Sequence, residues 1–362
     1  MHVFLTGEVQ IGKSTAINRF LASVPEKRVS GFKTVSRPRA GDGALEVLLS
    51  SPDGSNSHVV GLRLGNGRYE GYPEIFDEYG PALLDGTGDL VLMDEIGFME
   101  RHAARFSEAV LRTLDGTTPV LGVIKPKSTA LLDEIRARRD VCVMEVTAQN
   151  RDIIPTLLSR LLFGAEKLSA VIVAAGLSSR MGSFKPLLPL GGKPMLRLAI
   201  DNMCLAGADE IIVVTGHRAQ ELRGIIADAG AKEIYTPDFC VTGMYDSVKL
   251  GLRALDDSVG RVMLTPADSP AVMQSTYAAL LASAALIVRP TYEGSSGHPL
   301  IISGALIPYM LRYDGPRGMR GAVEHSGFKI AEVAVNDPGI TMDADTPEQY
   351  ENLRRWYELS GR

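Results

Sequence analysis

A phosphate-loop motif near the start of the chain limits the fold of the first half more than any other feature. Residues 3–6 are typical of a short strand, residues 15–21 are helical in composition, and the loop between them reads G-x-x-x-x-G-K-S. At this spacing the loop backbone wraps a β-phosphate, the lysine reaches the β- and γ-phosphates and the serine hydroxyl binds Mg²⁺. The motif therefore predicts an α/β domain that binds ATP or GTP. The predicted nucleotide-binding residues are Gly7, Gly12, Lys13, Ser14 and Thr15.

A second signal lies at residues 90–95, where four apolar residues are followed by Asp94 and Glu95. The pattern predicts a buried strand that delivers two carboxylates to its C-terminal end. Alone, such a pair is more often a solvated strand end. Together with the phosphate loop it indicates a Walker B segment, in which Asp94 would hold Mg²⁺ and Glu95 would polarise the attacking water.

The sequence D-E-I-G-F-M-E at residues 94–100 resembles the D-E-I-G-x-M-E signature of the small nucleoside-triphosphatases first described from thermophiles. Residues 31–34 and 146–152 resemble two further segments of that family, so the resemblance covers residues 1–163. The chain departs from the family pattern at residues 8–10 and at Phe98, where proline is common. The resemblance implies hydrolysis of ATP or GTP and does not specify the rate.

Asn150 and Arg151 lie in the last of these segments. They are candidates for recognition of a base or a phosphate. A helix cap and a surface cation are equal alternatives for the two residues.

A second strand and loop begin at residue 171. Residues 171–173 read as a buried parallel strand, and the small residues 174–176 let backbone N–H groups approach an anion closely. Arg180 and Lys185 would then neutralise a triphosphate. The predicted nucleotide-binding residues of this loop are Ala174, Ala175, Gly176, Ser178, Arg180, Met181, Gly182 and Lys185.

The string A-A-G-L-S-S-R-M-G-S-F-K at residues 174–185 resembles the opening loop of the MobA-like nucleotidyltransferases, most closely that of molybdopterin cytidylyltransferases. Sugar-phosphate nucleotidyltransferases carry a longer insert before their lysine, and guanylyltransferases usually show an L-A-G-G loop. The resemblance therefore favours CTP. It implies a Mg²⁺-dependent transfer reaction in residues 167–362.

The second half alternates strands and helices, which predicts a mainly parallel sheet covered on both faces. The expected strands are residues 211–215, 233–236, 261–265 and 286–288, and the expected helices are residues 194–206, 218–229, 245–255 and 270–283. The predicted fold class is α/β, with two doubly wound, mainly parallel domains. A P-loop nucleoside-triphosphatase domain over residues 1–163 would precede a Rossmann-like nucleotidyltransferase domain over residues 167–362.

Three carboxylates of the second half are candidate metal ligands. Asp268 follows a buried strand and resembles the family's metal-binding aspartate in a D-x-P context, with a helix N-cap as the alternative. In D-A-D-T-P, the alternation of a strand would place Asp343 and Asp345 on one side, able to share a cation. Residues 346–348 also read as a plain helix start.

The remaining candidate residues would bind the nucleotide or the acceptor. Gly243 and Ser247 lie in a G-M-x-x-S segment that resembles the family's nucleotide-contacting loop at a helix start. His298 could orient the substrate, although a histidine before proline is at least as often structural. Arg317 and Arg320, with adjacent glycines, offer an anion pocket for the acceptor's phosphate, and a mobile basic loop is the equal alternative.

Composition narrows the class of protein. The formal net charge of −5 argues against general affinity for nucleic acid, and 45% apolar with 22% charged residues is ordinary for a globular chain. No apolar run reaches the length of a membrane span, and the start of the chain leads into a motif, so we expect no membrane partner and a cytoplasmic protein. Three dispersed cysteines support neither a disulfide framework nor a zinc site.

The sequence thus predicts a bifunctional protein. Its second half would transfer a nucleotidyl group, most readily CMP from CTP or another NTP, to the phosphate of molybdopterin cofactor with release of pyrophosphate. The predicted catalytic residues are Lys185, Arg180 and Asp268 there, and Glu95 and Lys13 in the first half. The alternatives are a nucleotide-gated cofactor-insertion chaperone, with an apo-molybdoenzyme as a further candidate partner, or a guanylyl- or sugar-phosphate nucleotidyltransferase.

Overall fold

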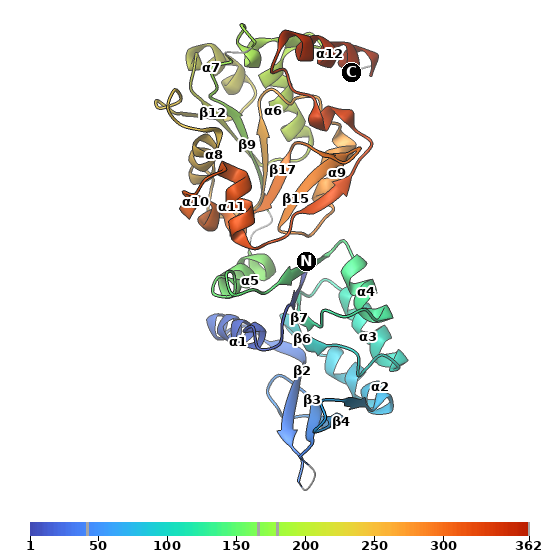
Figure 1. The fold of residues 1–362 in the computed structure, drawn as a ribbon. Helices are drawn as coiled ribbons and strands as arrows, with labels where there is room; N and C mark the ends of the chain where they lie inside the picture. The colour runs from blue at the N-terminus through green and yellow to red at the C-terminus, as the bar shows by residue number, and fades with distance from the viewer. Residues whose placement is uncertain (41–42, 165–166, 179–180, 361–362) are drawn as a thin grey trace. The chain divides into compact units, whose positions relative to one another are not determined.

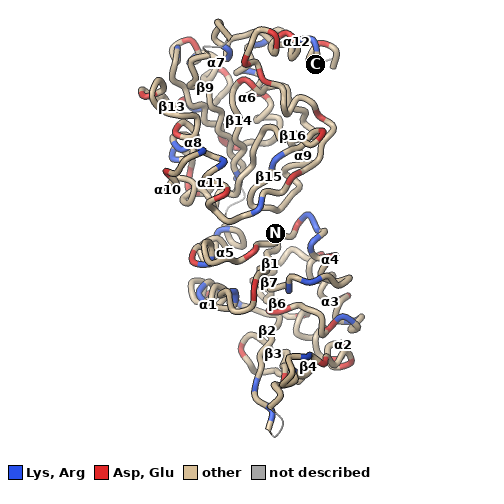
Figure 2. Tube along the Cα trace, in the orientation of Figure 1, with Lys and Arg blue, Asp and Glu red and all other residues tan. Residues whose placement is uncertain are grey.

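The computed structural model describes residues 1–40, 43–164, 167–178 and 181–360 of the 362-residue chain. The chain divides into two compact units, Met1–Phe163 and Gly164–Arg362 (Figure 1). Figure 2 shows Lys and Arg interspersed with Asp and Glu along the described part of both units. No helix among the described residues combines the length and apolarity needed to cross a bilayer.

The described part of the first unit forms an eight-stranded sheet in the order β5-β4-β3-β2-β6-β7-β1-β8, flanked by helices. Its elements are β1 His2–Thr6, α1 Lys13–Ser23, β2 Val29–Pro38, β3 Leu45–Ser50, β4 Ser57–Arg63, β5 Tyr69–Gly71, α2 Pro73–Leu84, β6 Leu90–Ile96, α3 Ala104–Leu114, β7 Val120–Ile124, α4 Ala130–Ala137, β8 Val141–Glu145 and α5 Ile154–Phe163. The neighbouring strands β2, β6, β7, β1 and β8 pair in parallel. Strands β3, β4 and β5 extend the sheet beyond β2 by antiparallel pairing.

Burial on both faces explains why the central strands of this unit are continuously apolar. All five residues of β7 are buried, as are the first four of β6. Helices α1 and α5 cover one face, and α2, α3 and α4 lie on the other (Figure 1). Because β7 lies between β1 and β6, the C-terminal ends of these three strands meet at one edge.

The second unit contains another mixed sheet, in which the described strands β13-β12-β9-β14 are parallel and β17, β15 and β16 continue antiparallel, with β18 beside β15. The described strands of this unit are β9 Lys167–Ala174, β10 Pro189–Leu190, β11 Lys193–Pro194, β12 Glu210–Thr215, β13 Lys232–Tyr235, β14 Val259–Pro266, β15 Ile287–Tyr292, β16 Ser295–Ser296, β17 Leu300–Ser303 and β18 Ala331–Ala334, of which β10 and β11 pair with each other in a separate small sheet. Its helices are η1 Lys185–Leu187, α6 Met195–Leu205, α7 Ala219–Asp228, α8 Met244–Arg253, α9 Gln274–Leu281, η2 Gly304–Leu306, α10 Ile307–Arg312, α11 Gly318–Ser326, η3 Pro338–Thr341 and α12 Pro347–Leu359.

Successive residues of β9 face opposite layers of this unit. Ile172 packs in the core with Leu196 and Ile200 of α6. Val171 faces α8, where a Cβ on Gly251 would lie 2.4 Å from its Cγ1 atom. Only a glycine lets α8 approach the sheet this closely, and other residues of α8 line the pockets described below.

The α/β fold class with large parallel sheets is confirmed, and two local expectations are wrong. The helix expected over 270–283 begins at Gln274, because residues 267–273 form turns instead. Asp343 and Asp345 lie in an irregular segment rather than on a strand. The antiparallel strands of both sheets were not expected from the sequence.

Candidate functional sites

The phosphate loop of the first unit joins β1 to α1. Gly7 and Gly12 have φ angles of 134° and 114°, a region that favours glycine, and a Cβ on Gly7 would lie 2.6 Å from the carbonyl oxygen of Val146. The Lys13 Nζ atom donates to the carbonyl oxygens of Gly7 at 2.9 Å and Glu8 at 2.7 Å. The ammonium group therefore lies across the loop.

The side chains expected to bind Mg²⁺ in this unit are placed by α1 and β6. Ser14 and Thr15 are exposed in the first turn of α1, and Asp94 and Glu95 lie near the end of β6. Burial and the neighbouring Glu95 carboxylate raise the pKa of Asp94 to about 6, against the opposing influence of Lys13. Burial also lowers the pKa of Lys13, although both carboxylates oppose that change. The lysine and the two carboxylates thus form one electrostatic group.

Two further residues near these carboxylates were not predicted as site residues, although Glu100 belongs to the D-E-I-G-F-M-E segment. Lys125, directly after β7, forms an ion pair with Glu95 at 3.0 Å between Nζ and Oε1. Glu100 is buried and accepts a hydrogen bond from the Gly97 N–H, and burial raises its pKa. Lys125 follows an apolar strand in the sequence, and that position alone does not distinguish it from a solvated lysine.

Asn150 stabilises the closing segment of the unit. Its fully buried side chain accepts from the Thr147 N–H at 2.8 Å and donates to the Glu145 carbonyl at 2.8 Å. These bonds engage its amide with the protein backbone. Arg151 lies beside the phosphate loop, with its Cδ atom 3.8 Å from the point that a Cβ of Gly12 would occupy.

The raised pKa of Asp94 predicts that Asp94→Asn stabilises the nucleotide-free protein at high pH. A carboxyl whose folded pKa is about 6 costs stability as pH rises from about 4 to 6, because the folded state must then hold a buried charge. The amide removes that cost, by up to about 3 kcal/mol above pH 6. We expect a higher thermal midpoint at pH 8 and little change at pH 4.

Asp89→Asn provides the control for this experiment. Asp89 precedes the same strand, but the Arg28 N–H and guanidinium lower its pKa, so its replacement should not stabilise the protein. An equal gain for Asp94→Asn at pH 4 and pH 8 would contradict the electrostatic explanation.

In the second unit, an ammonium group joins carboxylates that are distant in the sequence. The Lys185 Nζ atom donates to Asp268 Oδ2 at 3.0 Å and also to Asp345 Oδ1. Burial, followed by the charges of Asp345 and Asp268, raises the pKa of Asp343. The structure therefore brings together the lysine and all three predicted carboxylates. Arg180 lies outside the described residues.

A helix start was the alternative interpretation both for Asp268 and for residues 346–348, and the structure shows it only for the second. Asp268 is not the cap of α9, since that position belongs to Met273, whose N–H donates to Asp337 Oδ2 at 2.7 Å. Thr346 does cap α12, where its side chain accepts from the Gln349 N–H.

A pocket of about 230 Å³ lies beside the Lys185 cluster. It brings together, from several elements, most of the predicted nucleotide-binding residues of this unit. These are Ala174, Ala175, Gly176, Ser178, Lys185, Gly243 and Ser247, with Asp268 and Asp345. Met181 is buried, Gly182 has a φ of 70°, and neither is among the described residues that line the pocket.

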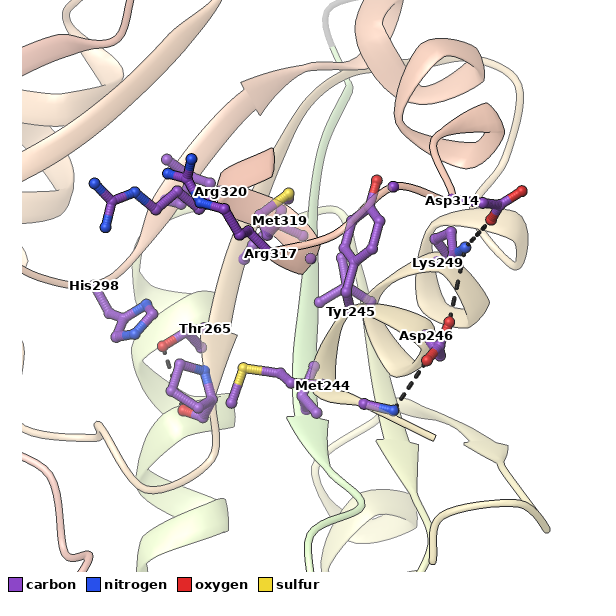
Figure 3. A pocket seen from close by; sticks show the side chains of 18 residues that line it. Met244, Tyr245, Asp246, Lys249, Thr265, His298, Asp314, Arg317, Met319 and Arg320 are labelled. Atoms are coloured by element: carbon purple, nitrogen blue, oxygen red, sulfur yellow. Dashed lines mark hydrogen bonds and ion pairs between the residues drawn. The ribbon is translucent and has the colours of Figure 1, made fainter. Parts of the chain in front are cut away.

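A second pocket of about 610 Å³ adjoins the first (Figure 3). The two share the lining residues Val173, Gly243, Met244 and Pro266. The larger pocket is lined by His298, Arg317 and Arg320, the three predicted substrate-binding residues. Figure 3 shows both guanidinium groups on the side where His298 lies.

The polar groups of this larger pocket are held by different contacts. Arg317 precedes α11 with a φ of 72°, and both arginines contact Glu324, at 2.5 Å for Arg317 and 3.2 Å for Arg320. The segment is thus a helix start rather than a basic loop. Burial lowers the pKa of His298, whose Nδ1 atom is buried without a hydrogen-bond partner among the described residues.

Lys249 was also missed in the sequence, where it reads as an ordinary helix position. Its nearly buried ammonium group lies between Asp314, at 2.7 Å, and Asp246, at 3.7 Å (Figure 3). It thereby ties α8 to the segment that precedes the two arginines.

The fold defines a protein with a P-loop unit and a nucleotidyltransferase unit, and each unit carries a candidate nucleotide-phosphate site. Residues 2–158 match the family model described as NTPase, and residues 170–330 match that of the MobA-like NTP transferase domain. The chain belongs to the NTPase family through its first half and carries a MobA-like NTP transferase domain in its second.

Similar proteins are found for each half of the chain. The molybdenum cofactor cytidylyltransferase of Escherichia coli is 29% identical over 193 residues, which span 52% of this chain and 97% of the relative. The cancer-related nucleoside-triphosphatase homolog of Mus musculus is 33% identical over 182 residues, 44% of this chain and 95% of the relative. The crystal structure of Rv0371c from Mycobacterium tuberculosis is 27% identical, covers 53% of this chain and 98% of its own, and has a TM-score of 0.48.

Proposed function

We propose that the second unit transfers CMP from CTP to the phosphate of molybdopterin cofactor and releases pyrophosphate. The observation that carries the proposal is the pair of adjoining pockets, one holding the phosphate loop with Lys185 and the other holding two arginines. A nucleotidyl transfer needs a donor and an acceptor next to each other at the α-phosphate. The resemblance to the cytidylyltransferase of Escherichia coli supports CTP and molybdopterin as this pair.

In this reaction an oxygen of the acceptor phosphate forms a bond to the α-phosphorus of CTP. The bond between the α-phosphorus and the α,β-bridging oxygen breaks, and that oxygen leaves with pyrophosphate. Lys185 and the backbone N–H groups of the loop would stabilise the charge that develops on pyrophosphate, as would Arg180. No general base is required, because the acceptor phosphate is already an anion. The chain therefore contributes mainly position and charge.

The carboxylates around Lys185 have the oxygen donors that suit Mg²⁺. The described residues contain no group of three or more acidic, histidine or cysteine side chains arranged to hold a metal ion. Mg²⁺ is commonly held by one or two carboxylates plus substrate phosphates, so this donor set fits a cation that arrives with the nucleotide. Asp268 with Asp345 or Asp343 would hold it, and it would neutralise charge on the α-phosphate.

The larger pocket suits an acceptor that combines a ring system with a phosphate. Met244, Tyr245 and Met319 give it apolar surface, and Arg317 and Arg320 would bind the phosphate. The lowered pKa of His298 keeps its imidazole neutral at pH 7, so the Nδ1 atom, which no described residue bonds, could hydrogen-bond the acceptor.

For the first unit we propose hydrolysis of ATP or GTP. Lys13 would bind the β- and γ-phosphates, Ser14 and Asp94 would hold Mg²⁺, and Glu95 would orient the attacking water. The oxygen donors of Ser14 and Asp94 fit that cation.

The transfer proposal predicts pyrophosphate release when the protein, MgCTP and molybdopterin are mixed, together with a cytidylylated product identified by mass spectrometry. GTP in place of CTP, and a sugar phosphate in place of molybdopterin, should give at most a few per cent of that rate, roughly the discrimination of a few kcal/mol. No pyrophosphate with any pair would favour a cofactor-insertion chaperone, and equal rates with GTP would remove the preference for cytidine.

A further inference from the structure

Lys125 lies where the sheet of the first unit brings the parts of a hydrolytic site together. It directly follows β7, which pairs in parallel with both β1 and β6. β1 leads into the phosphate loop, and β6 carries Asp94 and Glu95. The lysine therefore extends from the strand between the two motifs, at the edge where a triphosphate binds.

The structure holds the Lys125 side chain on several sides. Its Nζ atom is 3.0 Å from Glu95 Oε1, and it lies 5.1 Å from the ring centroid of Tyr69 and 5.0 Å from that of Phe98. A Cβ on Gly97 would be 3.1 Å from the Lys125 Cδ atom, so the lysine stem crosses the glycine closely. With 23% of its side chain exposed, the cation is fixed in place rather than freely solvated.

Two lysines thus share Glu95 as a neighbour. Lys13 interacts electrostatically with Asp94 and Glu95, and the charge of Lys125 contributes to lowering the pKa of Lys13. Like charges this near each other are unfavourable without an anion. A bound triphosphate supplies several negative charges and would relieve this repulsion.

We propose that Lys125 is a second catalytic cation of the NTPase site, which exchanges Glu95 for the γ-phosphate when the nucleotide binds. The inference rests on the proposed hydrolysis by this unit. In that reaction the water oxygen bonds to the γ-phosphorus, the bond to the β,γ-bridging oxygen breaks, and NDP and dihydrogen phosphate leave, with both protons of the water on the phosphate. Lys125 neutralises charge on the transferred phosphoryl group and leaves Glu95 free to orient the water.

The test compares Lys125→Met with Lys125→Arg. Methionine keeps an unbranched stem without the charge, so kcat for MgATP should fall about 100-fold or more, while KM changes less than about 3-fold. Arginine should restore part of kcat. Affinity for MgADP with aluminium fluoride, which resembles the transferred phosphoryl group, should fall as kcat does, whereas affinity for MgADP alone should not.

Lys127→Met is the matched control, because this lysine is two residues away and lies over the Phe98 ring at 4.7 Å. It should keep kcat within about 2-fold of the wild type. Measuring the analogue in a Glu95→Gln background separates direct contact from support of Glu95: Lys125→Met should weaken the analogue there too.

Unchanged kcat in Lys125→Met, equal weakening of MgADP and the analogue, or no further loss in the Glu95→Gln background would each overturn the proposal. Should Lys125→Met fail to fold, as a thermal melt would show, Lys125→Gln replaces it in the same measurements. A wild-type protein without turnover would refute the proposed hydrolysis, and the analogue affinities would still decide the role of Lys125.

Discussion

Lys13→Ala should abolish NTP hydrolysis by this protein while leaving nucleotidyl transfer close to the wild-type rate. The Lys13 ammonium already spans the phosphate loop through the carbonyls of Gly7 and Glu8, which is where the β- and γ-phosphates would bind. Loss of this charge should lower hydrolysis at least about 100-fold. The experiment measures phosphate release from ATP and pyrophosphate release from CTP with the same purified protein.

Transfer should be unaffected because its lysine and carboxylates belong to the other compact unit. Lys27→Ala is a suitable control, since this half-buried lysine follows the C-terminal end of α1 and lies over the Phe163 ring. Equal loss of both activities in Lys13→Ala would mean that the two halves share one composite site.

Asp268→Asn is expected to abolish transfer at low Mg²⁺ and to change fold stability little. Its carboxylate accepts a hydrogen bond from the Lys185 ammonium at 3.0 Å and lines the smaller pocket, and it is not the cap of the following helix α9. The amide preserves the shape and removes the charge on which a hard dication depends. We expect a loss of about 100-fold or more that shrinks as Mg²⁺ is raised, measured as pyrophosphate release across a Mg²⁺ titration.

Asp337→Asn should show the opposite pattern and serves as the control. This buried carboxylate accepts from the Met273 N–H, the Thr276 hydroxyl and the Gly339 N–H. Both carboxylate oxygens of Asp337 accept hydrogen bonds, whereas an asparagine amide has only one oxygen that can accept. The free energy of unfolding should therefore fall by about 1–3 kcal/mol, while folded molecules retain transfer. A normal transfer rate for Asp268→Asn at every Mg²⁺ concentration would remove the metal-ligand assignment.

The motifs could be predicted wherever the residues that carry the chemistry are neighbours in the sequence. In the phosphate loop, spacing alone specifies where glycine must stand and where the lysine points. The alternation of apolar and helical segments likewise predicted α6, α7 and β12 close to their observed bounds. Here local composition and tertiary structure favour the same conformation.

Prediction failed where the outcome depends on distant partners. The antiparallel strands β3, β4 and β5 acquire their conformation from pairing with one another and with β2. Asp343 and Asp345 were placed on a strand, yet an irregular backbone still brings them towards Lys185. Lys125 and Lys249 could not be distinguished from solvated lysines, because only the folded chain supplies their carboxylate neighbours.

The bond between Lys185 and Asp345 joins residues 160 positions apart. During synthesis at 5–20 residues per second, roughly 8 to 30 s separate the appearance of these two side chains. The phosphate loop and the Walker B carboxylates of the first unit are all made before that interval begins. A ribosome carrying this chain therefore displays the complete set of NTPase residues while the transferase site still lacks one of its acids.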